Sequence, residues 1–400
     1  MTLFYHRSYR EIPTGARRIL YGMRNVCLTR VGIVLALLFL VLPLGTHAQT
    51  QEQIQETDQF ARAKVITAVA EGSSLIPGTN VTSTKQTLTV EVLDGANKGK
   101  QVSFENDYTQ LSPGEVFYIR HITSLNDGTD QWSVADPYRL PVLFGLAAIF
   151  VILLCLFGGI QGIRGLMSLI GSIALIFYML IPTIYAGHSV ILISIGISSL
   201  IIIVGSYLTH GISRTTTSAM VGMLATVVVT GIGTYAVIHF ANLSGFTSET
   251  NAYLNFDTNG RINMIGLLFG GIMIGLLGVL YDIAVGQAVA VEELFLAGQY
   301  TRAQVYKRAM RIGREHIGAL VNTLAIAYVG TSLPLLLLFK ESNASIGFTI
   351  NSEIFATEII RILMGSIGLV LAVPITTLIA SYALQKIHRP SGTHSHSHTS

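Results

Sequence analysis

Two acidic residues, Asp282 and Glu293, follow a glycine-rich apolar run, where ionisable side chains are rare. They are eleven residues apart, which is nearly three helical turns, so a helix would place both carboxylates on one face. An ionisable side chain at membrane depth is a functional candidate, because lipid does not solvate its charge. The alternative is that Asp282 marks the boundary with water and that Glu293 is simply solvated.

A second group of polar residues, Glu315, Asn322 and Thr323, begins the next apolar run. Glu315 and Asn322 are seven residues apart and share a helical face. Asn and Thr inside a membrane span commonly form hydrogen bonds between helices, which is the structural alternative to a role in a solute pathway. The functional hypothesis is a polar line on two helices that consists of Asp282, Glu293, Glu315, Asn322 and Thr323.

Glycine is concentrated in the apolar run that precedes Asp282. Small residues four positions apart let membrane helices approach closely, so we expect these glycines to pack against neighbouring helices. A flexible helix, or one that lines a ligand site, is the alternative. The five residues are Gly266, Gly270, Gly271, Gly275 and Gly278.

No known catalytic or metal-binding motif accompanies these residues. The sequence lacks Gly-x-Ser-x-Gly, a P-loop, His-Glu-x-x-His and Cys-x-x-Cys, so we expect neither an enzyme nor a bound cofactor. His394, His396 and His398 alternate with serine, a pattern that can bind a divalent metal weakly. Because it has no ordered scaffold, we predict that 385–400 is a disordered tail without a metal site.

The composition indicates that lipid solvates much of the chain. Half of the 400 residues are hydrophobic and 12% are charged, and the mean hydropathy is +0.57. A soluble domain has about 25% charged residues. The net charge of +3 is too small to suggest nucleic-acid binding. Cys27 and Cys155 lie in or beside apolar stretches, which argues against a disulfide scaffold.

From Leu140 onward the chain alternates between long apolar runs and connecting loops. Runs of about 20 residues or more can cross a hydrocarbon core about 30 Å thick. We therefore predict that 139–384 is an all-α bundle of about seven transmembrane helices. The predicted spans are 140–160, 166–185, 189–208, 219–240, 262–281, 317–339 and 359–382, with longer loops at 241–261, 282–316 and 340–358.

The distribution of basic residues predicts the orientation. If residues 50–138 lie outside, the inner loops hold seven Lys and Arg residues and the tail holds two, against two in the outer loops. This bias agrees with the positive-inside rule and places the C-terminus in the cytoplasm. Most of these cations belong to 301–316, a predicted amphipathic helix that contacts anionic head groups or pairs with Glu292 and Glu293.

The chain before Leu140 predicts two further parts. Residues 1–48 join a basic leader to a short apolar run at 31–44, which indicates a signal peptide or, if it is not cleaved, an anchor. Residues 50–138 are polar and alternate with period two, as in Thr-Leu-Thr-Val-Glu-Val at 87–92. Five short strand candidates there predict a small extracytoplasmic β-barrel of OB type, which we interpret as a structural or protein-binding module.

The segments around Asp282 and Asn322 resemble the YibE/F family of bacterial membrane proteins. The first block is Gly-Val-Leu-Tyr-Asp-Ile-Ala-Val at 278–285, with Glu292 and Glu293 following; the second, at 313–334, contains Asn-Thr-Leu and Ala-Tyr-Val-Gly. At 285–287 the sequence departs from a family that is richer in serine, which puts a role for hydroxyl groups there in doubt. The resemblance covers roughly 60–400. It implies an integral protein of the bacterial cytoplasmic membrane and brings no established reaction or substrate.

Two functions remain open at this stage. The first is transport of a small solute or ion along the polar line, although no internal repeat is evident. The second is an assembly or interaction protein, whose outer domain binds a protein partner and whose bundle anchors it. A membrane enzyme is a distant third. The expected partners are the lipid bilayer, a protein at the outer domain and a second copy of the chain.

Overall fold

The structure is a computed structural model that describes residues 56–75, 82–124, 129–341 and 344–385. The chain divides into two compact units within its first long apolar helix, between Leu156 and Phe157. One unit contains the β-strands and the other contains most of the helices. The predicted signal peptide in 1–48 and the histidine-containing tail after Gln385 lie outside the described residues.

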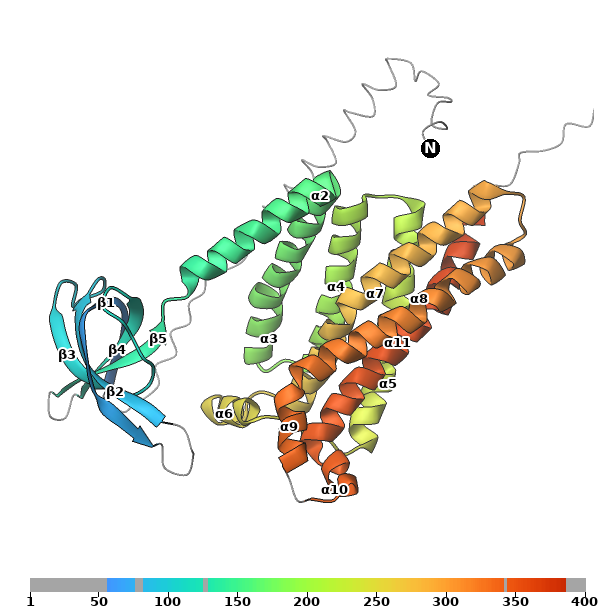
Figure 1. Ribbon diagram of the computed structural model, residues 1–400. Coiled ribbons are helices and arrows are strands. Elements are labelled where there is room, and N and C mark those ends of the chain that lie inside the picture. Colours follow the sequence, from blue (N-terminus) through green and yellow to red (C-terminus); the bar gives the residue numbers. More distant parts are fainter. Residues whose placement is uncertain (1–55, 76–81, 125–128, 342–343, 386–400) are drawn as a thin grey trace, which may run out of the picture. The chain divides into compact units, whose positions relative to one another are not determined.

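The first unit contains one antiparallel sheet of five strands (Figure 1). Its spatial order is β3-β2-β1-β4-β5. The two edge strands, β3 and β5, approach one another, so the sheet forms a half-barrel. The strands are β1 (Glu56–Leu75), β2 (Thr82–Val92), β3 (Gln101–Asn106), β4 (Val116–Ser124) and β5 (Asp130–Pro137).

The period-two pattern decides which face of the sheet is buried. Leu88, Val90 and Val92 of β2 are all buried, together with Phe117 and Ile119 of β4. The long strand β1 pairs with both β2 and β4 and has two shifts of register, which bend a strand and increase its twist. The predicted strands and their single buried face are therefore confirmed, while the OB type of barrel stays a prediction.

The other regular elements of the described chain are helices. Five of them are long and apolar enough to cross a membrane, or six if α8 and α9, which are bent by 63°, count as one span. The helices are α2 (Leu140–Leu175), a π-helical segment (Ile176–Leu180), α3 (Ile181–Tyr185), α4 (Val190–His210), α5 (Arg214–Phe240), α6 (Glu249–Asp257), α7 (Met264–Ala297), α8 (Arg302–Thr331), α9 (Leu333–Glu341), α10 (Ile346–Asn351) and α11 (Glu353–Gln385).

The first two predicted spans fall within one apolar helical run of 46 residues, Leu140–Tyr185. Its backbone leaves the helical conformation at Gly159, where φ is 53° and ψ is −138°. Since φ is positive there, glycine is the residue that tolerates this break best. The prediction of seven spans is neither confirmed nor contradicted by the helix lengths and stays a prediction.

The long loops of the prediction contain helices. The predicted loop at 282–316 is wrong for its first part, because α7 runs unbroken to Ala297. The amphipathic helix predicted at 301–316 is confirmed, because α8 begins at Arg302. The extension of α7 is stable because Gln287, Ala288 and Val291 are buried. Shorter helices, α6 and α10, occupy parts of the other two long loops.

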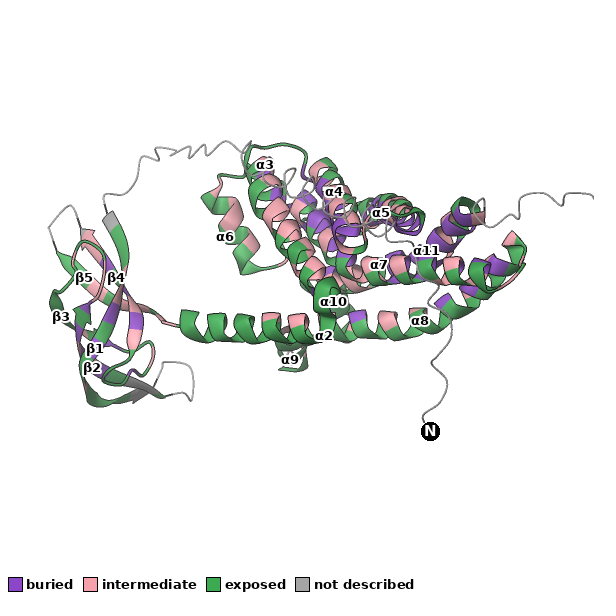
Figure 2. Cartoon of the chain, turned by 90° about the horizontal axis from the view of Figure 1, so that it is seen from above, coloured by how far each residue is buried: buried purple, intermediate pink, exposed green. Residues whose placement is uncertain are grey.

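The helices of the second unit pack around α7 and α11. Buried residues are concentrated on α4, α5, α7 and α11 (Figure 2). α5 and α11 approach closely at Gly222, where an added Cβ would lie 2.9 Å from the Cα of Thr376. Several buried hydroxyl groups, including those of Ser194, Ser198, Thr230 and Thr234, have no hydrogen-bond partner among the described residues.

Candidate functional site

The five residues of the predicted polar line all lie on the outside of the helix bundle. Asp282 and Glu293 are both exposed on α7, and Glu315, Asn322 and Thr323 are exposed on α8. Thr323 donates a hydrogen bond to the carbonyl of Ala319 in its own helix, at 2.9 Å. No hydrogen bond or ion pair in the described chain joins the two acids of α7 to the three residues of α8. The structure therefore does not bring them together by direct contact.

The two helices that carry this line are nevertheless neighbours. Gln287 Nε2 of α7 donates to the Ala309 carbonyl of α8 at 2.8 Å and to Thr377 Oγ1 of α11 at 2.9 Å. Nearer the N-terminus of α7, Gly275 lies beside the hydroxyl of Tyr328 of α8. Asp282 lies between these two contacts in the sequence of α7.

The five glycines of α7 have different surroundings. An added Cβ on Gly266 would lie 2.7 Å from Val190, and one on Gly270 would lie 2.6 Å from Ser194 Oγ, so α4 packs directly against both. Gly275 is equally close to Tyr328, at 2.5 Å. By contrast, an added Cβ on Gly271 or Gly278 would meet nothing within 4 Å. Gly271 therefore faces open space.

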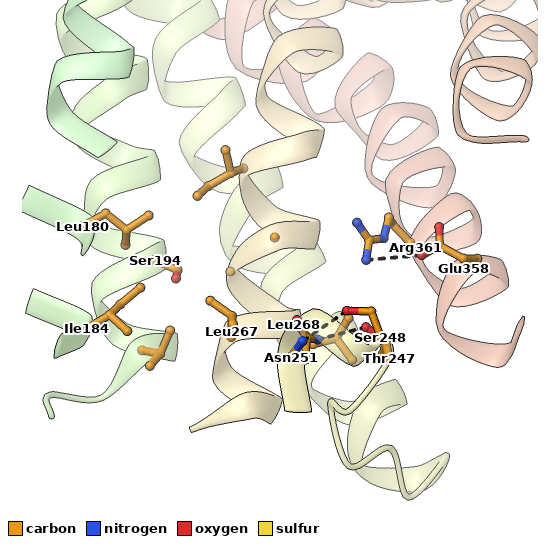
Figure 3. Close-up of a pocket in the computed structure, with 14 residues that line it drawn as sticks. Leu180, Ile184, Ser194, Thr247, Ser248, Asn251, Leu267, Leu268, Glu358 and Arg361 are labelled. Atoms are coloured by element: carbon orange, nitrogen blue, oxygen red, sulfur yellow. Dashed lines mark hydrogen bonds and ion pairs between the residues drawn. The ribbon is translucent and has the colours of Figure 1, made fainter. Parts of the chain in front are cut away.

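That open space belongs to a cavity of about 440 Å³ beside the N-terminal half of α7. Figure 3 shows Ser194 on one side of α7, Glu358 and Arg361 of α11 on the other, and Asn251 with its loop at one end. Its walls are formed by aliphatic side chains, glycines and six polar or charged residues. The lining residues are Leu180, Ile184, Val190, Ser194, Thr247, Ser248, Asn251, Leu267, Leu268, Gly270, Gly271, Ile274, Glu358 and Arg361.

An ion pair inside the apolar helix α11 forms one wall of the cavity. Arg361 Nη2 lies 3.4 Å from Glu358 Oε1, one turn away, and the two side chains are 28% and 25% exposed. Arg361 is eight residues from the start of α11, or about 12 Å along the helix. Ser332 Oγ donates to the other Glu358 oxygen at 3.3 Å. Arg361 Nε is buried and has no partner among the described residues.

The opposite wall contains a buried hydroxyl group. Ser194 is fully buried, and its Oγ has no hydrogen-bond partner among the described residues. A buried polar atom left without a partner costs about 1–3 kcal/mol. Such atoms usually mark a bound water or another polar species. Ser194 therefore places a polar atom without a partner in this wall of the cavity.

The loop before α6 is held in place beside this cavity. Glu353, at the start of α11, accepts hydrogen bonds from the backbone nitrogens of Ser244 and Gly245, both at 2.8 Å. Gly245 has a φ of +85°, and an added Cβ would lie 2.4 Å from the backbone of Met264. Asn251 Nδ2 donates to the Gly245 carbonyl at 2.9 Å. This part of the wall is therefore fixed by backbone contacts that only glycine permits.

The β unit has a separate cluster of charged side chains whose partners are all within that unit. Arg62 Nε lies 2.6 Å from Asp94 Oδ2, and this hydrogen bond lowers the pKa of Asp94. His121 stacks on Trp132 with ring centroids 3.8 Å apart, and its Nε2 lies 2.9 Å from Asp130 Oδ1. The hydrogen bond from His121 lowers the pKa of Asp130. These contacts join strands and loops of the sheet.

A family model covers the unit that contains the cavity. The model, described as YibE/F-like protein, matches residues 146–386, which is more than half of the chain. The chain belongs to the YibE/F-like family. The matched region of this YibE/F-like protein contains α4 to α11, the cavity and both groups of the polar line. No curated protein and no solved structure matches the chain.

Of the residues that line the cavity of this YibE/F-like protein, only Gly270 and Gly271 were candidates from the sequence. The sequence could have indicated Glu358 and Arg361, because Glu-Ile-Ile-Arg puts an acid and a base on one helical face at the start of an apolar run. Ser194 and Asn251 left no comparable signal, since serine and asparagine are common in spans and loops. Among the described residues, no group of three or more His, Cys, Asp or Glu could hold a metal ion.

Proposed function

We propose that this multi-pass membrane protein transports small polar solutes and that the cavity beside Gly271 is its solute-binding site. The observation that supports this most strongly is the Glu358–Arg361 pair, which lines a cavity between apolar helices. Charged side chains in membrane helices are costly and are usually directed at a pathway or a partner. A cavity of this size lies in the range of small-molecule sites.

Stability alone does not account for the pair. A buried ion pair often contributes no more to stability than apolar residues of the same size, because both charges lose their hydration. The ion pair between Arg361 and Glu358 has an N–O distance of 3.4 Å, which is longer than a charge-assisted hydrogen bond of about 2.8 Å. The pair is therefore well suited to exchange partners when a solute enters.

The proposal includes the predicted topology. Counting the helical segments on either side of Gly159 as two spans, and α8 with α9 as one, gives seven in all. Together with the positive-inside bias, this places residues 50–138 in the extracytoplasmic space and the C-terminus in the cytoplasm. In that orientation the cavity opens toward the extracytoplasmic side. The approach of β3 to β5 supports an OB-like barrel for the outer domain.

Asp282, Glu293, Glu315, Asn322 and Thr323 are candidates for the other end of the pathway. The cavity lies beside the first third of α7, whereas Asp282 lies beyond its midpoint. A solute that left the cavity toward the cytoplasm would pass from the level of Gly271 to the level of Asp282. These residues are therefore proposed to line the exit rather than the binding site.

The test is flux into proteoliposomes with one radiolabelled probe for each class of solute: glycerol, glycine, lactate, phosphate and rubidium. We expect at least one probe to enter faster than into protein-free liposomes. Gly271→Leu should reduce that flux at least tenfold, because its side chain enters the cavity without meeting another atom within 4 Å at Cβ. Gly196→Leu, an equally open position on α4 outside the cavity, is the matched control and should keep the flux. If no probe enters faster with monodisperse protein, the proposal is wrong.

A second function, protein binding by the outer domain, is supported by two apolar side chains on β1. Phe60 is 61% exposed and Val69 is 58% exposed, although apolar residues on a half-buried sheet normally face its core. If these side chains contact a partner, Phe60→Ser should abolish its co-purification with the full chain, and unchanged co-purification would contradict this role.

A further inference from the structure

We propose that the cavity binds a small aliphatic monocarboxylate, with the carboxylate on Arg361 and the hydrocarbon part against α3, α4 and α7. This inference rests on the proposed function, since it names the solute class of the same site. Three independent features of the cavity support it: the incomplete pairing of Arg361, the unpartnered hydroxyl of Ser194 and the apolar side chains between them.

The head group is indicated by the unused donors of Arg361. A guanidinium has five N–H groups in a planar fork that matches a carboxylate. Glu358 lies 3.4 Å from Nη2, and Nε is buried without a partner among the described residues. A second oxyanion can therefore bind the Nε side of the fork once the Arg361 side chain turns toward the cavity.

Helix ends near the cavity add to this preference for an anion. Val190 at the start of α4 and Ser248 just before α6 both line the cavity. The N-terminus of a helix carries a partial positive charge of about +0.5. At the start of α4, Ser189 makes no capping hydrogen bond through its side chain. Its first-turn N–H groups therefore add to the positive potential that the cavity presents.

The remaining walls of the cavity indicate that the rest of the ligand is apolar. Leucine, isoleucine and valine contribute six of the lining residues, enough to enclose a short hydrocarbon chain. Gly271 leaves the space beside α7 open, because no atom lies within 4 Å of an added Cβ. A purely ionic solute, such as phosphate, would leave these apolar walls without contacts. An amphiphilic monoanion contacts both Arg361 and the apolar walls.

Glu358 then acts as an internal competitor for Arg361. An incoming carboxylate replaces its contact with Nη2, and Glu358 keeps the hydrogen bond from Ser332. The two charged residues should therefore have opposite effects on affinity. Removal of the arginine charge weakens binding, whereas removal of the glutamate charge strengthens it.

The experiment uses three probes with the same six-carbon chain: hexanoate, hexanol and hexylammonium. Equilibrium dialysis of the purified full chain in detergent should show saturable binding of hexanoate alone. We expect Arg361→Gln to weaken the binding of hexanoate at least tenfold and Glu358→Gln to strengthen it severalfold. Gly271→Leu should abolish saturable binding, so the hexanoate that remains with this variant measures uptake by the micelles. Gly278→Leu should bind hexanoate like the unaltered chain.

The outcomes separate this inference from the proposed function. If hexanol binds as well as hexanoate, or if Glu358→Gln weakens binding, the carboxylate assignment is wrong. Flux of glycine or rubidium without hexanoate binding would also overturn it, while leaving transport intact. Hexanoate binding with no flux of any probe would leave the ligand assignment standing and contradict transport. Because Arg361→Gln could disturb folding, Gly271→Leu provides an independent test that alters no charged residue.

Discussion

Ser194 of α4 occupies the space beside Gly270 of α7 that a side chain would otherwise fill. Its Oγ lies 2.6 Å from the position of an added Cβ, whereas its own Cβ is 3.5 Å away. Ser194 is fully buried and also lines the cavity. The packing of these two helices and the wall of the cavity therefore depend on the same pair of residues.

The contact predicts a compensating pair of substitutions. Gly270→Ala should lower stability by about 1–3 kcal/mol, because the new methyl group overlaps the Ser194 hydroxyl. Ser194→Ala removes that oxygen, so the double variant should recover most of the loss. Thermal unfolding of the purified protein in detergent, monitored as the fraction that stays monodisperse, measures the loss in the single variant and the recovery in the double variant. Equal losses in the single and double variants would contradict the contact.

A second packing prediction concerns α5 and α11. Gly222→Ala should be among the most destabilising glycine substitutions, because the new Cβ would meet the Thr376 backbone at 2.9 Å, which no rotamer change relieves. Gly233→Ala is the matched control on the same helix, since it meets only the flexible end of Met364, at 3.1 Å. The same unfolding assay should rank Gly222→Ala well below Gly233→Ala, and the reverse order would show that these helices do not approach at Gly222.

The β unit should lose stability in acid through Asp94. The hydrogen bond from Arg62 lowers the pKa of Asp94 below its usual value of 3.8. The stabilisation is therefore complete above that value and disappears as the pH falls through the lower pKa of the folded state. Trp132, the one tryptophan in the sequence, lies in β5 and reports unfolding of this unit.

Asp94→Asn should consequently lower the unfolding temperature near neutral pH and flatten its decline between about pH 5 and about pH 2. The effect should be modest, because the two side chains of the pair are 42% and 39% exposed. Asp130 leaves a residual pH dependence, since its pKa is also lowered. Identical pH profiles for the variant and the unaltered chain would rule out a role for the Arg62–Asp94 pair.

The proposed exit can be tested at Asp282. Asp282→Asn keeps the shape of the side chain and removes its charge, so it should abolish the flux measured in proteoliposomes while hexanoate binding at the cavity is retained. Glu341→Gln, which changes another exposed acid at the end of α9, should have no effect on flux. Unaltered flux in Asp282→Asn would remove the polar line of α7 and α8 from the pathway.

Local patterns were sufficient for the elements but not for the cavity. Alternation at 87–92 predicted a strand with one buried face because burial in a sheet follows sequence period directly. The extension of α7 could not be predicted in this way. It depends on Gln287, whose hydrogen-bond partners are Ala309 and Thr377, 22 and 90 residues further along the chain.

The candidate site shows the same limit more strongly. Ser194, Asn251, Gly271 and Arg361 come from four helices, and only the fold brings them to one cavity. The sequence identified α7 as important through its glycines, yet it could not distinguish Gly270, which packs against Ser194, from Gly271, which faces open space. The environment of each glycine is set by neighbouring helices rather than by its own spacing.

The most direct test of transport through this cavity is access to Gly271 from each side of the membrane. Gly271→Cys, in a chain whose Cys27 and Cys155 are replaced by alanine, would be treated with a membrane-impermeant methanethiosulfonate in right-side-out and in inside-out vesicles. A transport site must open to each side in turn, so we predict modification in both preparations, and none in either for Gly196→Cys, an equally open position on α4 outside the cavity. Modification of Gly271→Cys from one side only would contradict transport through this cavity.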